Sequence, residues 1–385
     1  MRMTQLKTIA DIQTGPFGSQ LHKEDYVETG TPIVTVEHLG NRVFTEQNLP
    51  RVSDSDKARL IKYTLSTGDI VFSRVGSVDR CSYVDKSHDG WMFSGRCLRV
   101  RPTELVDSLY LYYYFCLEET KQFVRNIAVG ATMPSINTKL LGEVEIALPD
   151  LNNQKRIAAV LSSLDDKIEN NQKLNDNLAE LLQTVYQDRF GDVSAATEQG
   201  MLSDICSYSR DRVAVSELNT STYFSTENML PGKAGSTDAS SLPTIPQTTA
   251  CHKGDTLISN IRPYFKKIVY CEGRCGCSTD VLCFTPVQPK YAAYLFSTLY
   301  ADKFFAFMVA GSKGTKMPRG DKQQIMAYPV ALPSDEELDE FNALALPILA
   351  QLHSNKVENK RLSATRDALL PKLMSGEIEV SGIQL

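Results

Sequence analysis

Four cysteines lie close together in the chain, at Cys271, Cys275, Cys277 and Cys283. Four thiolates can hold a tetrahedral zinc ion. However, the intervals between them lack the paired C-x-x-C spacing of most zinc sites. Cys275 and Cys277 instead alternate like residues on one face of a β-strand. The pattern favours buried thiols, with a metal-dependent enzyme built on this cluster as an alternative.

Basic residues gather in the glycine-rich stretch 311–322, GSKGTKMPRGDK. A glycine-rich loop can approach a nucleic-acid backbone closely, where Lys and Arg anchor phosphates and Arg, Gln and Asn read base edges. The alternative for each of these residues is an ordinary solvated charge. The candidate DNA-binding residues are Phe17, Ser19, Gln20, Arg74, Arg80 and Lys139 in the first half, and Arg262, Lys266, Lys267, Lys313, Lys316 and Arg319 in the second.

Motifs for catalysis are missing from the sequence. It contains no G-x-G-x-x-G, no phosphate-binding G-x-x-x-x-G-K-[ST], and no Asn-Pro-Pro-Tyr or Asp-Pro-Pro-Tyr of the kind expected in an amino-methyltransferase. Pro149-Asp150 could begin a nuclease carboxylate pair, but the only suitable Glu-x-Lys downstream is Glu358-Asn359-Lys360. We therefore expect a non-catalytic chain with no metal site.

Charge is distributed unevenly along the chain. The net charge of −5 does not by itself indicate a nucleic-acid-binding protein, yet residues 201–333 carry 14 Lys and Arg against 10 Asp and Glu. A DNA-binding surface must therefore be local to the globular parts. Nine cysteines without a regular framework, and no apolar run of membrane-spanning length, lead us to expect a cytoplasmic protein with no membrane partner.

A heptad pattern runs through residues 150–191 and predicts a long helix. Such a helix could position the loops that carry the candidate DNA-binding residues. Asp150 is the expected N-cap and Gly191 the expected end. About 40 residues at about 1.5 Å each give a rod of about 60 Å, which needs a partner helix. The seam positions, three and four residues apart in turn, are Ile157, Leu161, Leu164, Ile168, Asn171, Asn175, Leu178, Leu182 and Val185.

The expected partner helix covers residues 334–376. Its seam repeats the first at a constant offset of 184 residues, so that Asn171 and Asn175 correspond to Asn355 and Asn359. Polar seam residues fix the register of a coiled coil. We predict an antiparallel pair in which the four asparagines meet at the centre and satisfy each other. Pro347 should kink or restart the second helix. The alternative is two unrelated amphipathic helices.

The segments between the helices repeat as well. Gly68-Asp69 returns as Gly254-Asp255, and the loop 130–134 returns as 314–318. Strands are expected at 31–39, 70–73, 92–100, 144–148 and 256–259, with aromatic-rich helices at 108–126 and 290–309. The predicted fold class is α+β: two tandem mixed α/β domains, 1–149 and 192–333, separated by a long antiparallel two-helix coiled coil, with a pseudo-twofold internal repeat.

Taken together, these motifs resemble the specificity subunit of type I restriction–modification systems. The segments 154–190 and 366–380 look like the central and C-terminal helical regions of that family, and the resemblance covers essentially the whole chain. Gly68-Asp69, Met133-Pro134 and Ser278-Thr279-Asp280 match recurrent landmarks of its target-recognition domains.

The resemblance implies that each globular domain reads one half of a split target in double-stranded DNA. It also implies that the helices space the domains and dock two methyltransferase subunits, to which restriction subunits then bind. S-adenosylmethionine, ATP and magnesium are expected in those partner subunits and not in this chain. A coiled-coil adaptor that binds proteins instead of DNA is the alternative.

Overall fold

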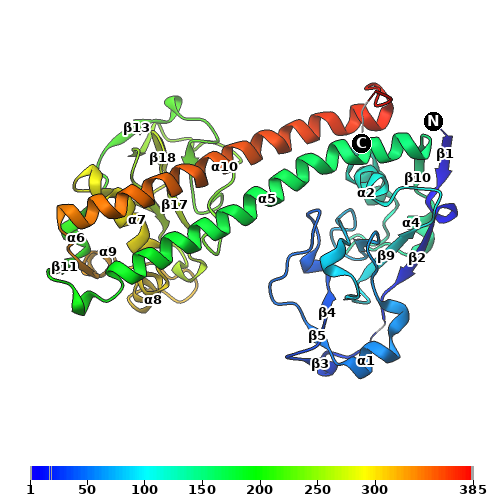
Figure 1. Ribbon diagram of the computed structural model, residues 1–385, viewed down its shortest axis with the longest axis horizontal. Coiled ribbons are helices and arrows are strands. Elements are labelled where there is room, and N and C mark those ends of the chain that lie inside the picture. Colours follow the sequence, from blue (N-terminus) through cyan, green and yellow to red (C-terminus); the bar gives the residue numbers. More distant parts are fainter. Residues whose placement is uncertain (1, 17, 19, 383–385) are drawn as a thin grey trace. The chain divides into compact units, whose positions relative to one another are not determined.

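The computed structural model describes residues 2–16, 18 and 20–382. The chain forms two compact units (Figure 1). Unit 1 contains residues 1–169 and 359–385, and unit 2 contains residues 170–358. Each unit therefore holds one globular domain together with one part of each of two long helices, α5 (Leu151–Phe190) and α10 (Asp335–Ser375).

Unit 1 is built on two four-stranded sheets and one two-stranded sheet. In the first sheet, β9 pairs antiparallel with both β2 and β6. The sheet orders are β2 (Ala10–Thr14), β9 (Cys97–Pro102), β6 (Ile70–Ser73), β7 (Cys81–Tyr83); then β3 (Tyr26–Val27), β5 (Arg51–Val52), β4 (Thr31–Val34), β8 (Met92–Phe93); and β1 (Arg2–Gln5) with β10 (Glu145–Leu148). Its shorter helices are α1 (Asp54–Arg59), α2 (Ser108–Cys116), α3 (Glu118–Ile127) and α4 (Thr138–Gly142).

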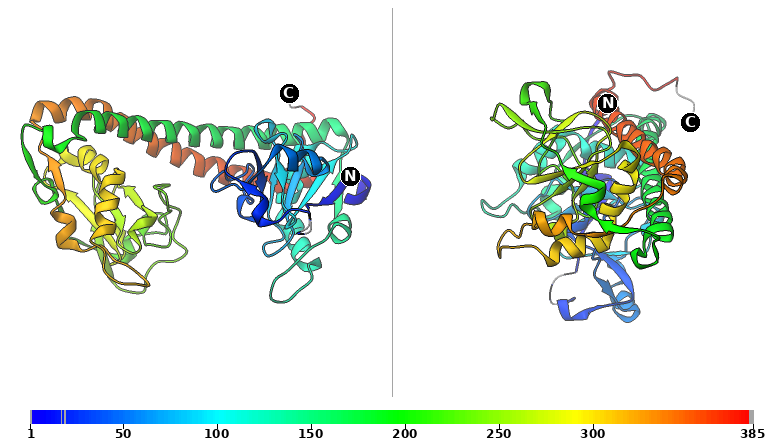
Figure 2. Two further views of the ribbon diagram at one scale, coloured as in Figure 1. Left: turned by 90° about the horizontal axis from the view of Figure 1, so that it is seen from below. Right: turned by 90° about the vertical axis from the view of Figure 1, so that its left-hand side faces the viewer.

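Unit 2 repeats the first four-stranded sheet and the two-stranded sheet of unit 1, but in its second four-stranded sheet the last two strands stand in the opposite chain order. Its strands lie on one side of the paired ends of α5 and α10 (Figure 2). The sheet orders are β12 (Cys206–Tyr208), β19 (Val281–Pro286), β16 (Thr256–Ser259), β17 (Ile268–Tyr270); then β13 (Arg212–Ala214), β15 (Gln247–Cys251), β18 (Cys275–Cys277), β14 (Tyr223–Phe224); and β11 (Gln199–Met201) with β20 (Pro329–Ala331). Its shorter helices are α6 (Leu202–Ile205), α7 (Ala292–Tyr300), α8 (Asp302–Ala310) and α9 (Lys322–Met326).

The internal repeat extends to single hydrogen bonds. The hydroxyl of Tyr110 donates to the carbonyl oxygen of Ala147 at 2.6 Å, and that of Tyr294 donates to Ala331 at 2.6 Å. Asp69 and Asp255 each accept a hydrogen bond from the backbone N–H three residues earlier, at 2.8 Å in both units. This bond closes the turn that leads into β6 or β16. The Gly-Asp repeat of the sequence is thus a repeated turn.

Four predicted elements differ from the structure. The strand expected at 31–39 ends at Val34 and is followed by a 3-10 helix, Val36–His38. The strand expected at 92–100 is two strands, β8 and β9, which belong to different sheets. The helices expected at 108–126 and 290–309 are each broken into two, α2 and α3 or α7 and α8, because Leu117 and Ala301 adopt non-helical backbone angles.

In unit 1, the two long helices run antiparallel. The side-chain amide of Asn359 donates to the carbonyl oxygen of Ile168 at 3.3 Å, and further along Arg366 pairs with Asp165 at 2.6 Å. The carboxylate of Asp165 also accepts a hydrogen bond from the hydroxyl of Tyr113 in α2 at 2.7 Å. Asp165 is only 5% exposed, so this junction fixes a helix of the globular domain to both long helices.

In unit 2 the helices are also antiparallel, but an aromatic cluster joins them to the globular domain. The rings of Tyr186 and Phe190 in α5 pack against Phe341 in α10 and Tyr294 in α7. Phe341 is fully buried. At the offset of 184 residues, Asp165 of unit 1 corresponds to Leu349. A buried ionic junction in one unit is therefore apolar in the other.

The seam asparagines of unit 2 follow the prediction in part: one pair bonds to each other, whereas Asn171 also bonds to a glutamate that the prediction did not include. The amide of Asn355 donates to the side-chain oxygen of Asn175 at 2.8 Å, and Asn171 donates to the carboxylate of Glu358 at 2.7 Å. Asn171 and Asn355 are both 3% exposed. Because a buried amide loses free energy when it has no hydrogen-bond partner, these contacts specify the register of the two helices.

The ends of the helices follow the sequence closely. Asp150 accepts a hydrogen bond from the backbone N–H of Asn153 at 3.0 Å and so acts as the N-cap of α5. Ser334 and Glu337 form the reciprocal bonds of a capping box at the start of α10. The predicted restart at Pro347 is wrong, because α10 continues through it. The neighbouring Ala345, Ile348 and Leu349 are buried against unit 2, and this packing offsets the hydrogen bond that proline cannot donate.

Candidate nucleic-acid interface

Two segments of unit 2 come together to form the most basic loop surface predicted from the sequence. The turn after β16 reaches the loop after α8, where the backbone N–H of Arg262 donates to the carbonyl oxygen of Pro318 at 2.8 Å. The loop is closed at its neck by two mutual hydrogen bonds between Lys313 and Arg319, both 2.9 Å. We call residues 313–319 the tip loop of unit 2. Candidates from both segments are thus adjacent in space.

The turn after β16 has an unusual backbone. Arg262 and Lys266 adopt left-handed conformations, with φ of 50° and 51°, on either side of a single 3-10 turn, Pro263–Phe265. Non-glycine residues rarely adopt such angles unless the surroundings hold them there. The turn presents Tyr264 and Phe265, which are 50% and 39% exposed. Sequence reasoning missed these two rings, because only the structure shows that they are not in the core.

Several of the predicted basic residues already have acidic partners. Lys313 pairs with Asp321 at 2.5 Å, Arg319 pairs with Asp280 at 2.9 Å, and Lys266 pairs with Asp302 at 2.8 Å. These side chains remain 81%, 55% and 40% exposed, so solvent and an anionic ligand can still reach them. Such pairs hold each cation in place at the surface and contribute little stability by themselves.

The remaining candidates of unit 2 differ in their accessibility. Lys316 is exposed at the end of the tip loop, and the guanidinium of Arg262 donates to its carbonyl oxygen at 3.4 Å. Lys267 donates to the carbonyl oxygen of Thr226 at 2.5 Å, and burial lowers the pKa of its ammonium group. Lys267 therefore links the turn after β16 to the segment after β14, whereas Lys316 and Arg262 are exposed to solvent.

Asp302, the first residue of α8, ties the turn to a second loop. It accepts hydrogen bonds from Lys266 and pairs with Lys233, each at 2.8 Å, and Lys233 is also left-handed, with φ of 64°. The two lysines lower the pKa of the Asp302 carboxyl from 3.8 to about 2. Lys233 was not predicted from the sequence, because its partner is distant along the chain.

The pairs around Asp302 should give the stability of unit 2 a defined pH dependence. The folded pKa lies below the unfolded one, so the stabilisation is complete above about pH 4 and is lost as the pH falls towards about 2. We expect the unfolding free energies of wild type and Asp302→Asn to differ by a constant amount, below about 1 kcal/mol, near neutral pH. The difference should shrink below about pH 4 in urea titrations; a difference that grows on acidification contradicts this assignment.

Unit 1 contains the same loop framework. Val129 and Ser135 exchange two backbone hydrogen bonds of 2.9 and 2.8 Å, and the N–H of Gly76 donates to the carbonyl oxygen of Pro134 at 2.8 Å. Residues 129–135 are the tip loop of unit 1. Its neck residues, Val129 and Ser135, are neutral where those of unit 2 are Lys313 and Arg319. The two units therefore present different chemistry on one backbone design.

The predicted residues of unit 1 are less concentrated. Arg74 supports the tip loop, since its carbonyl oxygen accepts from the N–H of Ile136 at 2.9 Å. Arg80 and Lys139 are exposed. The side chain of Gln20 accepts a hydrogen bond of 2.7 Å from the hydroxyl of Tyr63, which uses part of its capacity. Phe17 and Ser19 lie outside the described residues.

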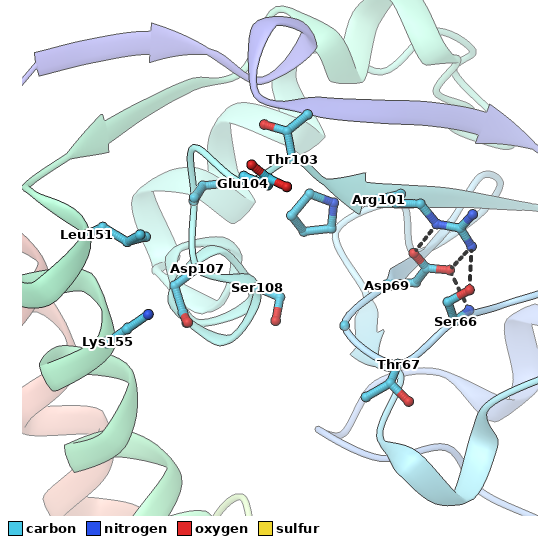
Figure 3. A pocket seen from close by; sticks show the side chains of 13 residues that line it. Ser66, Thr67, Asp69, Arg101, Thr103, Glu104, Asp107, Ser108, Leu151 and Lys155 are labelled. Atoms are coloured by element: carbon cyan, nitrogen blue, oxygen red, sulfur yellow. Dashed lines mark hydrogen bonds and ion pairs between the residues drawn. The ribbon is translucent and has the colours of Figure 1, made fainter. Parts of the chain in front are cut away.

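Unit 1 also has a polar cavity of about 440 Å³ beside the first turns of α5 (Figure 3). Leu151 and Lys155 project into it from the helix, opposite Asp69 and Arg101. Arg101 makes two hydrogen bonds to the Asp69 carboxylate, at 2.8 and 2.7 Å, and this contact raises the pKa of Arg101. The buried carboxylate is thus neutralised, and it fixes β9 to the turn before β6.

The four cysteines singled out in the sequence do lie together, with Cys251 as a fifth member. The sulfur atoms of Cys271 and Cys275 are 3.5 Å apart, and the Cys283 thiol lies 3.3 Å from the Asp255 carboxylate. All five are buried. Across the described ranges, no group of three or more His, Cys, Asp or Glu side chains is placed to hold a metal ion. The thiols fill the core between β15, β18 and β19.

Comparison with known proteins identifies a family model and several relatives. Residues 1–180 match the family model of the type I restriction modification DNA specificity domain. The MjaIX specificity subunit of a type I restriction enzyme from Methanocaldococcus jannaschii is 24% identical over 306 residues, which cover 72% of this chain and 71% of that protein. The HindI specificity subunit from Haemophilus influenzae is 27% identical over 135 residues, 34% of this chain and 29% of the relative.

Among solved structures, the type I restriction–modification S subunit from M. genitalium has a similar fold. It aligns with a TM-score of 0.61 and 18% identity over 97% of this chain and 95% of that one. At this identity the likeness concerns the fold. Separately, none of the helices in the described part of the chain is long and apolar enough to span a membrane.

Proposed function

We propose that this chain, a specificity subunit of the type I restriction–modification family, binds double-stranded DNA through both of its globular domains and so determines which sequence the partner enzymes modify. One observation supports this most strongly. Both units contain a tip loop whose neck is closed by two backbone hydrogen bonds. The neck residues are Val129 and Ser135 in unit 1, and Lys313 and Arg319 in unit 2. A loop with the same backbone but different side chains in the two domains is suited to the recognition of two different DNA sequences.

Within this proposal, the basic residues have two roles. Lys316, exposed at the end of its loop, contacts a phosphate. Arg319 and Arg262 have planar guanidinium groups that can bind guanine through two hydrogen bonds. Domain 1–149 reads one part of the target and domain 192–333 the other. The helical segments 150–191 and 334–376 connect the domains and fix the spacing of the two parts.

The partner enzymes supply the chemistry. We propose that two methyltransferase subunits dock on the long helices and that restriction subunits bind through them. S-adenosylmethionine, ATP and magnesium then belong to those subunits, and this chain acts without a cofactor. Exposed leucines on α5 support docking there: Leu174 and Leu181, seven residues apart on one helical face, are 44% and 47% exposed. A protein-binding adaptor that never contacts DNA gains no support from the DNA specificity domain at residues 1–180.

The salt dependence of binding tests the phosphate contact. For the chain in complex with its methyltransferase partner, the logarithm of affinity for a duplex should fall linearly with the logarithm of salt concentration. Lys316→Ala should reduce the magnitude of that slope by about 1, the amount expected for the loss of one phosphate contact. It should weaken binding equally to all sequences. The measurement is a fluorescence-anisotropy titration at several salt concentrations.

Lys253→Ala is the matched control. Lys253 is an exposed lysine of the same unit, but it precedes β16 whereas the Arg262 turn follows it, so the two lie at opposite ends of that strand. Its removal should leave the slope unchanged. An equal loss of slope in both variants would mean that the tip loop is no special contact, and affinity independent of salt would contradict DNA binding through these cations.

A further inference from the structure

Each tip loop carries an exposed methionine followed by a proline. Met133 in unit 1 is 56% exposed, and Met317 in unit 2 is 51% exposed. The next residues, Pro134 and Pro318, are half-buried. Both methionines therefore stand at the outer end of a loop whose base is packed. A large apolar side chain gains free energy when a ligand covers it, by about 1.5–3 kcal/mol for complete burial.

The loops are built to be stiff. Their necks are closed by paired backbone hydrogen bonds, and each proline carbonyl accepts a further 2.8 Å bond, from Gly76 in unit 1 and from Arg262 in unit 2. Gly130 and Gly314, the second residues of the two loops, have φ of +109° and +103°, angles that side chains rarely allow. At Gly130 an added Cβ would lie 2.7 Å from the carbonyl oxygen of Met133. The tip is thus held in one conformation before any ligand arrives.

The residues around the methionine differ between the two tip loops, but the methionine itself is present in both. At the offset of 184 residues, Thr132 corresponds to Lys316 and Ser135 to Arg319, whereas Met-Pro is the same in both loops. Residues that read sequence must differ between two readers of different sequences. A residue that is identical in both fits a task that does not depend on sequence.

Together, the position, stiffness and identity of these residues indicate what they contact. We propose that Met133 and Met317 are apolar wedges, each of which inserts at a base step of the bound duplex and partly unstacks it. This inference rests on the DNA-binding function proposed above and adds the mode of contact. Apolar side chains such as Met and Pro are used in this way by proteins that kink DNA. In unit 2, the exposed cations Lys316 and Arg319 beside the tip draw it towards the phosphates.

The experiment uses the full chain in complex with its methyltransferase partner, and a duplex that carries the motif methylated by that complex. Met133→Ala and Met317→Ala should each weaken binding by about tenfold without changing the salt slope, because the lost contact is apolar. Met133→Leu and Met317→Leu should retain most of the affinity. A 2-aminopurine base placed at successive steps should brighten on binding at one step per domain, and each alanine variant should abolish the signal of its own domain only.

Met201→Ala is the control, since Met201 is 53% exposed in unit 2 but lies on β11, outside the tip loop. Three outcomes overturn the wedge. The first is full affinity and unchanged 2-aminopurine signals in both alanine variants. The second is loss of methyltransferase assembly, measured by size-exclusion chromatography, which would assign the methionines to a protein contact. The third is a wild-type complex that binds its motif no better than random duplex, which overturns the proposed function as well.

Discussion

Replacing Asp165 with alanine is expected to destabilise the protein by about 3 kcal/mol, measured as the free energy of unfolding in urea. The substitution leaves the guanidinium of Arg366 and the hydroxyl of Tyr113 without the carboxylate that pairs with both, at 2.6 and 2.7 Å. Burial and the neighbouring Asp165 charge raise the pKa of Tyr113, so its hydroxyl stays protonated and requires an acceptor. The loss should loosen α2 from both long helices.

Two further variants show whether the loss of stability comes from the buried Asp165 pair or from the exposed pair beside it. Arg366 also pairs with Asp367 at 2.8 Å, but Asp367 is 64% exposed, so Asp367→Ala should cost less than about 1 kcal/mol. The double variant Asp165→Leu with Arg366→Leu imitates unit 2, where the corresponding residues are Leu349 and Leu182. It should be more stable than Asp165→Ala, because an apolar pair leaves no buried charge unpaired. If all three variants were equally stable, Asp165 would have no role at the junction.

Replacing Phe341 with alanine is expected to cost about 3–5 kcal/mol. Phe341 is fully buried, and its ring packs edge-on against those of Tyr186 and Phe190, with centroids 6.5 and 5.5 Å away. The cavity left behind lies where α5, α10 and the globular domain of unit 2 meet, so the surroundings cannot collapse easily. Calorimetry or urea unfolding measures the loss.

Leu344→Ala tests whether the stabilisation depends on the buried position of Phe341 or on any large apolar side chain of α10. Leu344 lies one turn further along α10 and is 39% exposed, so its truncation should cost less than about 1 kcal/mol. A cost similar to that of Phe341→Ala would place the main stabilisation in α10 itself, instead of in its contact with the globular domain.

The long helices could be predicted from the sequence because their pattern is local and strongly periodic. The heptad seams, the cap at Asp150 and the capping box at Ser334 depend on residues a few positions apart. Asn355 could be assigned to the seam for the same reason, and the predicted antiparallel arrangement brought it near the asparagines of the other helix, although no single pair such as Asn355 with Asn175 could be named. Pro347 misled the prediction, because buried neighbours outweigh a single missing backbone hydrogen bond.

Other features depend on contacts between distant residues. The sequence at 92–100 reads as one strand, yet β8 and β9 join different sheets, and no local signal marks that change. The basic residues were identifiable by type, but their partners Asp280 and Asp302 were not, since they come from elsewhere in the chain. The sequence placed the tip methionines in loops, but only the fold showed how far they are exposed.

In the proposed function, this chain chooses the DNA sequence on which its partners act. Mapping methylated adenines in the genome of a bacterial host that expresses the chain with its methyltransferase partner tests this claim most directly. We expect one motif made of two specified segments separated by a fixed number of unspecified bases. Methylation that follows a single uninterrupted motif, or no motif at all, would contradict it.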